Sequence, residues 1–168
     1  MKNFKGFLFA VVAFAALTLS ASAQSSLPSL GGGRVDLDAQ KGKVVILAVG
    51  ATWLPLSIKQ AEYANALAKR YTGKNVVIYF IATDSTVGSS KNFASDEDVR
   101  KFVGTSKLAI TVLRDSDGAL TLKRYNLDQL PSFVILDKQG RQAGEAFGGI
   151  DPKFDVTIPV SKAVDGLL

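Results

Sequence analysis

Residues 44–71 decide the fold, and they read VVILAVGATWLPLSIKQAEYANALAKRY. The first part, Val44–Val49, is a continuous apolar and mostly β-branched run, which is typical of a strand buried on both faces. From Pro55 to about Tyr71 the apolar residues recur at spacings of three and four, which is typical of a helix, and Gly73 then stops it. The stretch therefore predicts a strand, a short loop ATWLPLS and a helix.

A second strongly apolar run, NVVIYFIA at residues 75–82, follows this helix. Because one helix separates the two runs, we predict two parallel strands joined by a right-handed crossover. Ser95 precedes three acids, which is an N-cap signal for another helix. We predict one α/β domain with a central mixed sheet flanked by helices. Its other expected elements are a strand at 110–113, a short helix at 119–125, a hairpin turning at 137–140 and ending near 147, and a helix at 160–168.

The first 23 residues have the organisation of a secretory signal peptide. Two lysines precede the apolar run Phe7–Leu19, and Ala21–Ala23 offers small residues for cleavage before Gln24. As a helix this run covers about 20 Å, which is short of the roughly 30 Å of a membrane core. We therefore expect export to the periplasm or the medium, with no membrane span in the mature chain.

The mature chain divides into two parts by composition. Residues 24–33 are rich in serine and end in three glycines, so we predict a flexible lead-in there. Order is expected to begin near Arg34. Residues 34–168 are long enough for one hydrophobic core, and we predict a single domain over that range.

The chain contains no cysteine and no histidine. These absences exclude a thiolate nucleophile, an imidazole base and the usual zinc ligands, so we predict no cofactor and no metal. The signal segment carries two lysines and no acid, which leaves a net charge of +3 on the mature chain. This excess is small and its basic residues are interspersed with acids, which argues against nucleic-acid binding.

Two motifs carry a resemblance to a known family. They are KGKVVILAVGATWLPLSIKQ at residues 41–60 and YNLDQLPSFVILDKQGR at residues 125–141. Both resemble the TlpA/ResA branch of exported thioredoxin-like proteins, which is also grouped with the redoxin and AhpC/TSA families. The resemblance runs from about Leu27 to Gly149. It implies a thioredoxin-like fold, and for the family a thiol-disulfide oxidoreductase or antioxidant activity.

The same resemblance places the two family cysteines on Leu54 and Ser57. Leucine has no ionisable atom and cannot cap a helix, and a serine hydroxyl has no disulfide state. Thiol-disulfide exchange is therefore chemically excluded, and we interpret the chain as a pseudoenzyme with no catalytic residue. Gly50 stands where the family has an aromatic ring, which either opens a small cleft or leaves a space that Trp53 fills.

The resemblance also implies that Pro131 is cis and faces the degenerate loop. Its candidate binding surface consists of six residues from the two motifs: Trp53, Leu54, Pro55, Leu56, Leu130 and Pro131. Trp53 has an alternative role as a packing residue that covers the core. The surface is more apolar than the family pattern, and it suits binding without chemistry.

Three functions stay open on the sequence. The first is a binding module for an unknown protein or peptide partner in the cell envelope. The second is a structural or assembly role in which recognition occurs elsewhere, for example at the polar loop Thr83–Ala94. The third is a non-thiol enzyme, but Ser57 would need a base and no histidine exists. Asp115, Asp117 and Gly118 form only part of a calcium-loop pattern, and we predict a plain turn.

Overall fold

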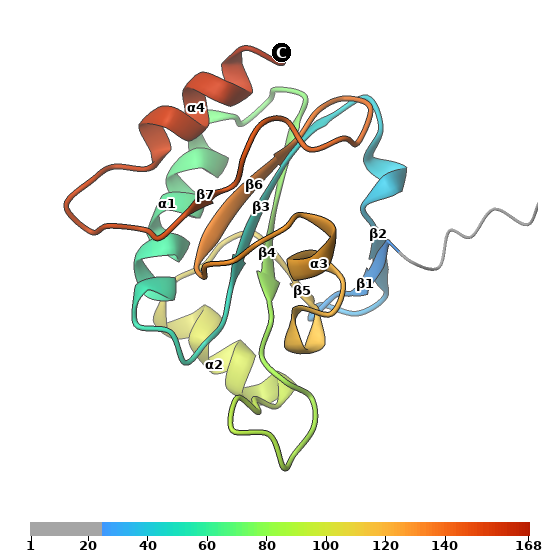
Figure 1. The fold of residues 1–168 in the computed structure, drawn as a ribbon, viewed down its shortest axis with the longest axis vertical. Helices are drawn as coiled ribbons and strands as arrows, with labels where there is room; N and C mark the ends of the chain where they lie inside the picture. The colour runs from blue at the N-terminus through green and yellow to red at the C-terminus, as the bar shows by residue number, and fades with distance from the viewer. Residues whose placement is uncertain (1–24) are drawn as a thin grey trace, which may run out of the picture.

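The computed structural model describes residues 25–168, and the predicted signal peptide lies outside them. The chain builds a five-stranded sheet, a separate two-stranded hairpin and four α-helices within this range (Figure 1). The strands are β1 Ser26–Pro28, β2 Arg34–Asp36, β3 Val44–Gly50, β4 Val76–Ala82, β5 Thr111–Arg114, β6 Ser132–Leu136 and β7 Phe147–Gly148. The α-helices are α1 Leu56–Arg70, α2 Asp96–Thr105, α3 Thr121–Arg124 and α4 Thr157–Asp165, and short 3-10 helices cover Asp38–Gln40 and Ser116–Gly118.

The five-stranded sheet has the order β5-β4-β3-β6-β7. β3 pairs with β4 in parallel, and β4 pairs with β5 in parallel. β6 runs antiparallel to β3, and β7 runs antiparallel to β6. The predicted mixed sheet is confirmed, and the crossover from β3 through α1 to β4 is the parallel unit that residues 44–82 predict.

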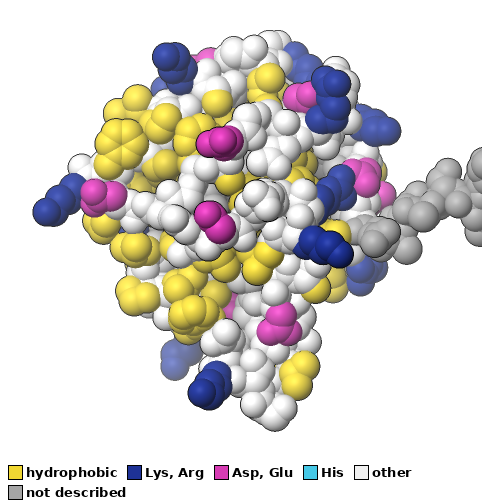
Figure 2. Space-filling view, viewed as in Figure 1, with side chains coloured by type: hydrophobic (Ala, Val, Ile, Leu, Met, Phe, Trp, Pro, Cys, Tyr) yellow, Lys and Arg dark blue, Asp and Glu magenta, His cyan; other side chains and the backbone are white. Residues whose placement is uncertain are grey.

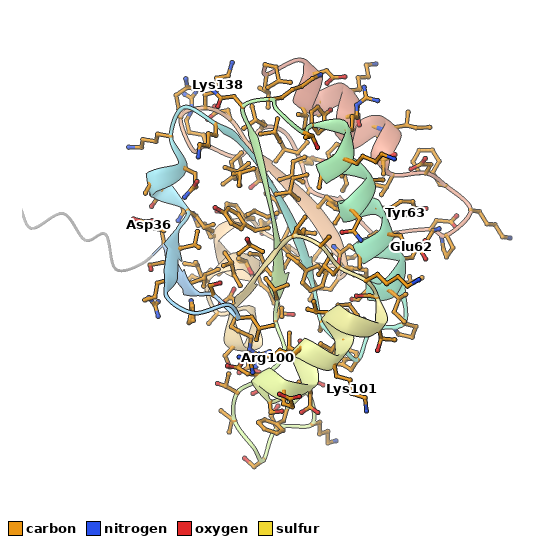
Figure 3. The ribbon with its side chains drawn as sticks, turned by 180° about the vertical axis from the view of Figure 1, so that it is seen from behind. Asp36, Glu62, Tyr63, Arg100, Lys101 and Lys138 are labelled. Carbon is orange, nitrogen blue, oxygen red and sulfur yellow. The ribbon has the colours of Figure 1, made fainter. Side chains whose placement is uncertain are left out.

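β3 divides the core into two halves. All seven of its residues are buried, and alternate side chains enter opposite clusters. Val44, Ile46 and Ala48 pack with side chains of α1, α2 and α4 on one face. The opposite face is covered by the β1–β2 hairpin and the segment around α3, so helices flank the sheet unequally. Figure 3 shows the molecule from behind, where Glu62 and Tyr63 mark α1 and Arg100 and Lys101 mark α2, two of the helices on the first face.

The N-terminal segment differs from the sequence-based expectation. Order begins before Arg34, because β1 pairs antiparallel with β2 and Leu27 is buried. Gly32 and Gly33 form the intervening turn, and both have positive φ, which glycine adopts at little cost. The flexible lead-in predicted for residues 24–33 is thus wrong for this stretch, since Leu27 packs against residues of the second core cluster that are distant in sequence.

The C-terminal helix α4 covers the core on the face of the sheet that also carries α1. α4 begins at Thr157, three residues before the predicted start, and the Tyr71 hydroxyl at the end of α1 donates to Asp165 at 2.9 Å. Val160 and Val164 are fully buried in the core cluster that contains α1. Within residues 25–168 no helix has the length and apolar character needed to span a bilayer.

Candidate functional site

Loop 51–57 connects β3 to α1 and presents apolar side chains to solvent. Trp53 is 55% exposed, Pro55 is exposed, and Leu54 and Leu56 are half-buried. Figure 2 shows hydrophobic side chains gathered on the side of the molecule that carries α1, α4 and this loop. Trp53 therefore presents about half of its side-chain surface to solvent and is available for contact with a partner.

The cis-proline predicted from the resemblance is present, at the Leu130–Pro131 bond. Val49 of β3 lies opposite Ser132 of β6 in the antiparallel register. The residues that follow Val49 lead into loop 51–57, and the residue before Ser132 is Pro131, so the two motifs meet at one end of the sheet. Pro131 is buried and Leu130 is half-buried.

The buried side chain of Gln60 links these two motifs through hydrogen bonds. It is fully buried, and its side-chain amide donates to Val49 O at 3.1 Å and to Ser132 O at 2.8 Å. The Gln60 Oε1 atom has no hydrogen-bond partner among the described residues. Sequence reasoning missed Gln60, because its bond to Ser132 joins residues 72 positions apart.

Gly50 is required by this packing. A Cβ added there would collide with Gln60 Oε1 and would come within 2.9 Å of Ser57 Oγ and 3.3 Å of a Phe80 ring carbon. The space expected at Gly50 is therefore neither an open cleft nor filled by Trp53; Gln60 and Ser57 fill it.

Asp84 holds the outer part of the loop. Its buried carboxylate accepts hydrogen bonds from Thr52 N at 2.9 and 3.1 Å and from Thr52 Oγ1 at 2.7 Å. Arg114, also buried, lies behind it with Nη1 3.9 Å from Asp84 Oδ2. Asp84 lies two residues after the predicted strand 75–82, and Arg114 directly follows the predicted strand 110–113. Both are thus at the carboxyl ends of neighbouring strands, and that shared position was the available signal for them.

The loop offers no acid-base chemistry. Ser57 is fully buried and its Oγ accepts from Ala51 N at 3.3 Å, so it is not presented as a nucleophile. The nearest lysine in sequence, Lys59, forms an ion pair with Glu62 at 2.6 Å, and this pairing raises the Lys59 pKa. A cation with a raised pKa is a poor general base.

The partial calcium-loop pattern is a structural turn. The Asp115 carboxylate accepts from the backbone N–H groups of Leu120 and Thr121 and from the Thr121 hydroxyl at 2.6 Å. Asp117 accepts from Ser85 Oγ. In the part of the chain that the structure describes, no three or more potential metal-binding side chains of His, Cys, Asp or Glu cluster together.

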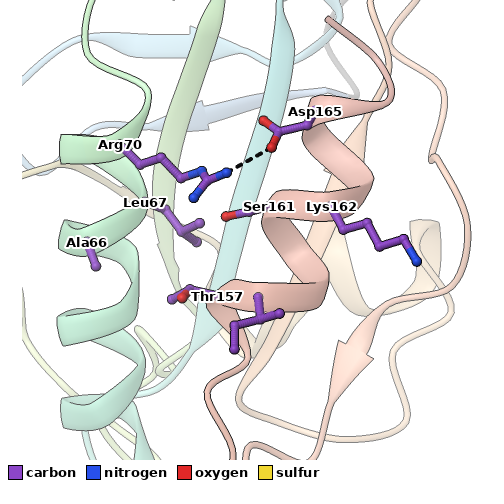
Figure 4. A pocket seen from close by; sticks show the side chains of 8 residues that line it. Ala66, Leu67, Arg70, Thr157, Ser161, Lys162 and Asp165 are labelled. Carbon is purple, nitrogen blue, oxygen red and sulfur yellow. Dashed lines mark hydrogen bonds and ion pairs between the residues drawn. The ribbon is translucent and has the colours of Figure 1, made fainter.

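A separate groove of about 550 Å³ lies between α1 and α4 (Figure 4). Arg70 and Asp165 form an ion pair across it at 2.8 Å. Hydrogen bonds from Arg70 and then Tyr71 lower the pKa of Asp165. The groove lies along the last turn of α1, whereas loop 51–57 leads into the first turn. The groove is therefore distinct from the binding surface that the sequence predicts.

Comparisons with known proteins agree with this architecture. The model of the AhpC/TSA family matches residues 20–141. The chain is 30% identical over 119 residues to the thiol-disulfide oxidoreductase ResA of Bacillus thuringiensis subsp. konkukian, covering 71% of this chain and 63% of that relative. It is 30% identical over 115 residues to the thioredoxin-like protein YneN of Bacillus subtilis, covering 68% and 62%. The chain thus spans less than two thirds of the length of these relatives.

Solved structures show the same fold at lower identity. The structure of MTB dsbF in its mixed oxidized and reduced forms matches with a TM-score of 0.68 and 20% identity, over 90% of this chain and all of that one. The pneumococcal exposed lipoprotein thioredoxin Etrx1 from Streptococcus pneumoniae TIGR4 matches with a TM-score of 0.67 and 22% identity, over 84% and 98%. With its thioredoxin-like fold and its match across residues 20–141, the chain belongs to the AhpC/TSA family.

Proposed function

We propose that this protein is a redox-inactive thioredoxin-like binding module that holds a peptide or protein partner in the cell envelope. The binding surface is formed by Trp53–Leu56 on one motif and Leu130–Pro131 on the other. The observation that carries the proposal is an apolar loop with an exposed Trp53, at the same end of the sheet as Pro131, in a chain that has no cysteine. Binding is the part of the family's chemistry that these residues still support.

The loss of redox chemistry follows from the sequence. Thiol-disulfide exchange proceeds through a mixed disulfide, and no residue of this chain can form one. In an insulin-reduction assay with dithiothreitol, the purified protein is expected to leave the background rate unchanged. A rate above background in a preparation free of thioredoxin would contradict the proposal.

Export is part of the same proposal. The N-terminal 23 residues have the order of a signal peptide, and a structural relative from Streptococcus pneumoniae is described as an exposed lipoprotein. Sequencing the N-terminus of the protein recovered from the periplasm or the medium tests this point. A mature chain that begins at Gln24 is expected.

Photocrosslinking tests the binding surface directly. A benzoylphenylalanine at Leu56 is expected to form a discrete adduct in envelope extract, and a second substitution, Trp53→Ala, is expected to reduce its yield. Ile158 is the control position, because its side chain is 66% exposed on α4 and is outside the proposed surface. The same adducts from Leu56 and Ile158, unaffected by Trp53→Ala, would instead favour an assembly role with recognition elsewhere.

The second candidate function rests on the segment between β4 and α2. Val87 and Phe93 are 56% and 45% exposed there, so an assembly role through this segment has its own apolar contacts. A discrete adduct from a benzoylphenylalanine at Val87, with none from Leu56, would support that candidate.

A further inference from the structure

The buried carboxylate of Asp84 connects loop 51–57 to the segment that follows β4. Asp84 is 0% exposed and accepts from both the backbone N–H and the hydroxyl of Thr52, the residue before Trp53. Hydrogen bonds to an ionised acceptor are stronger than those between neutral groups. Asp84 is therefore placed to fix the outer part of the loop.

Arg114 extends this attachment to a third region. Its Nη1 lies 3.9 Å from Asp84, its Nη2 donates to Ala94 O at 2.7 Å, and its Nε lies 3.3 Å from Asp96 in the first turn of α2. Asp84 and Ala94 bound the segment that projects beyond the sheet, drawn in green in Figure 1. One guanidinium thus contacts both ends of the projecting segment.

The Asp84–Arg114 pair is buried, and the hydrogen bonding of Arg114 is incomplete. Arg114 is 5% exposed, and its Nε and Nη1 atoms have no hydrogen-bond acceptor among the described residues. Burying a charge pair costs desolvation energy that the attraction between the charges often fails to recover. Buried polar groups with incomplete hydrogen bonding weaken a core, and such departures from local rules are expected at functional or strained sites.

We propose that Asp84, backed by Arg114, is the positioning residue of the binding loop, and that it joins this loop to the segment Ser85–Ala94. The inference rests on the function proposed above for the loop. Asp84 does not touch the partner; it acts through Thr52, whose position sets that of Trp53. The partner then meets a loop held in one conformation, which lowers the ordering cost of binding.

Asp115 provides a matched control. It is 4% exposed, it lies just after β5 while Asp84 lies two residues after β4, and it likewise accepts from a backbone N–H and a threonine hydroxyl. Its bonds hold the start of α3 and do not reach loop 51–57. Asp84→Asn and Asp115→Asn therefore make the same chemical change at two buried sites, of which one concerns the loop.

The readouts are local to the loop. Trp53 is the only tryptophan, so acrylamide quenching of the fluorescence reports its exposure alone. Asp84→Asn is expected to increase quenching and to speed hydrogen exchange of the Thr52 amide by about tenfold, the effect of losing a hydrogen bond to a charged group. Asp115→Asn is expected to leave both values unchanged while exchange at Thr121 rises.

If Asp84→Asn does not fold, a smaller change at Thr52 tests the same attachment of the loop. Thr52→Val removes the hydroxyl bond and leaves the Asp84–Arg114 pair intact, so it is expected to increase Trp53 quenching by a smaller factor. Unchanged quenching in Thr52→Val, or equal changes in Asp84→Asn and Asp115→Asn, would overturn the positioning role.

Partner capture separates this inference from the proposed function. With the Leu56 crosslinker, Asp84→Asn is expected to lower adduct yield as Trp53→Ala does, and Asp115→Asn is expected to keep it. If Trp53→Ala has no effect on yield, the proposed function fails, while quenching and exchange still decide how the loop is held. If Trp53→Ala lowers yield and Asp84→Asn does not, the function stands and the positioning role is overturned.

Discussion

The first turns of α1 and α2 differ in their capping and in their charge. α2 begins after Ser95, whose hydroxyl accepts from Asp98 N while the Asp98 carboxylate accepts from Ser95 N, and its first turn holds three acids. α1 begins after Pro55 with no side-chain cap from the described residues and no acid in its first turn. Caps and acids at this end stabilise a helix, so α2 has a start suited to stability and α1 does not.

The difference shows where α1 gets its stability. Ala61, Ala64 and Leu67 are buried against the sheet, and Gln60 bonds to two strands, so tertiary packing holds the helix without a cap. The positive end of the α1 dipole is consequently left beside the apolar loop. A helix end of this kind lowers the pKa of a thiol placed at it, and the residue placed there in this chain is Leu54.

Restoring the thiols is the strongest way to test this view of α1. Leu54→Cys combined with Ser57→Cys is expected to raise insulin reduction from background to a measurable rate, because the uncapped start of α1 is in place to stabilise a thiolate. Each single substitution serves as a control that cannot form the intramolecular bridge. Two cysteines that fail to bridge would show that their Cα atoms lie beyond about 7 Å, contrary to a thioredoxin-like loop.

The two helix starts can also be compared by single thiols. In Leu54→Cys the uncompensated helix end is expected to bring the thiol pKa below the roughly 8.5 of a free cysteine. In Ser95→Cys the three acids of the first turn of α2 are expected to keep the thiol pKa higher. Rates of iodoacetamide alkylation against pH give both values. Equal pKa values would remove the electrostatic contrast between the helices.

Two glycines extend the comparison to packing. Gly50→Ala is expected to destabilise the protein by about 1–3 kcal/mol, because the new methyl group meets Gln60 and Ser57. Gly104→Ala in α2 has open space around it and is expected to stabilise the protein by about 0.5–1 kcal/mol. Urea denaturation measures both changes. A neutral Gly50→Ala would mean that Gln60 can move aside.

Removing the α2 cap is expected to have a similarly small effect on stability. Ser95→Ala is expected to cost about 1 kcal/mol of unfolding free energy at neutral pH, measured by urea denaturation. The hydrogen bonds from Ser95 lower the pKa of Asp98, its side-chain bond being the largest cause.

The effect of the α2 cap therefore depends on pH with a definite sign. Because the folded-state pKa of Asp98 is below its unfolded-state value, the stabilisation is complete above about pH 4 and is lost as pH falls through the folded-state value. The difference between wild type and Ser95→Ala is expected to shrink in acid. A constant difference down to about pH 2 would contradict the role of Asp98.

Patterns among residues that are neighbours in the sequence were sufficient to predict much of this fold. β3 and α1 were predicted within one or two residues of their observed ends, and the Ser95 cap was predicted from the acids that follow it. These features depend on neighbours in sequence. The N-terminal strand was missed because the burial of Leu27 depends on a core cluster that includes Leu113 and Tyr125.

The interior of the site required the structure for the same reason. Thr52 and Asp84 are 32 positions apart, and no periodicity in the sequence relates them. Gly50 was noted in the sequence, but only the placement of Gln60 explains it. The exposed residues of the candidate site can be named from the motifs, whereas the buried residues that support them depend on tertiary pairing.

Each edge of the five-stranded sheet is protected. Along β5, Leu30 N donates to Val112 O at 2.9 Å and Ser29 bridges Leu113, while β7 at the other edge has two residues. Open strand edges are templates on which further chains add and aggregate. Since both edges give little opportunity for strand addition, we expect concentrated solutions to stay free of fibrils. The proposed binding loop, at the end of the central strand β3, is thereby kept apart from the strand edges on which chains could polymerise.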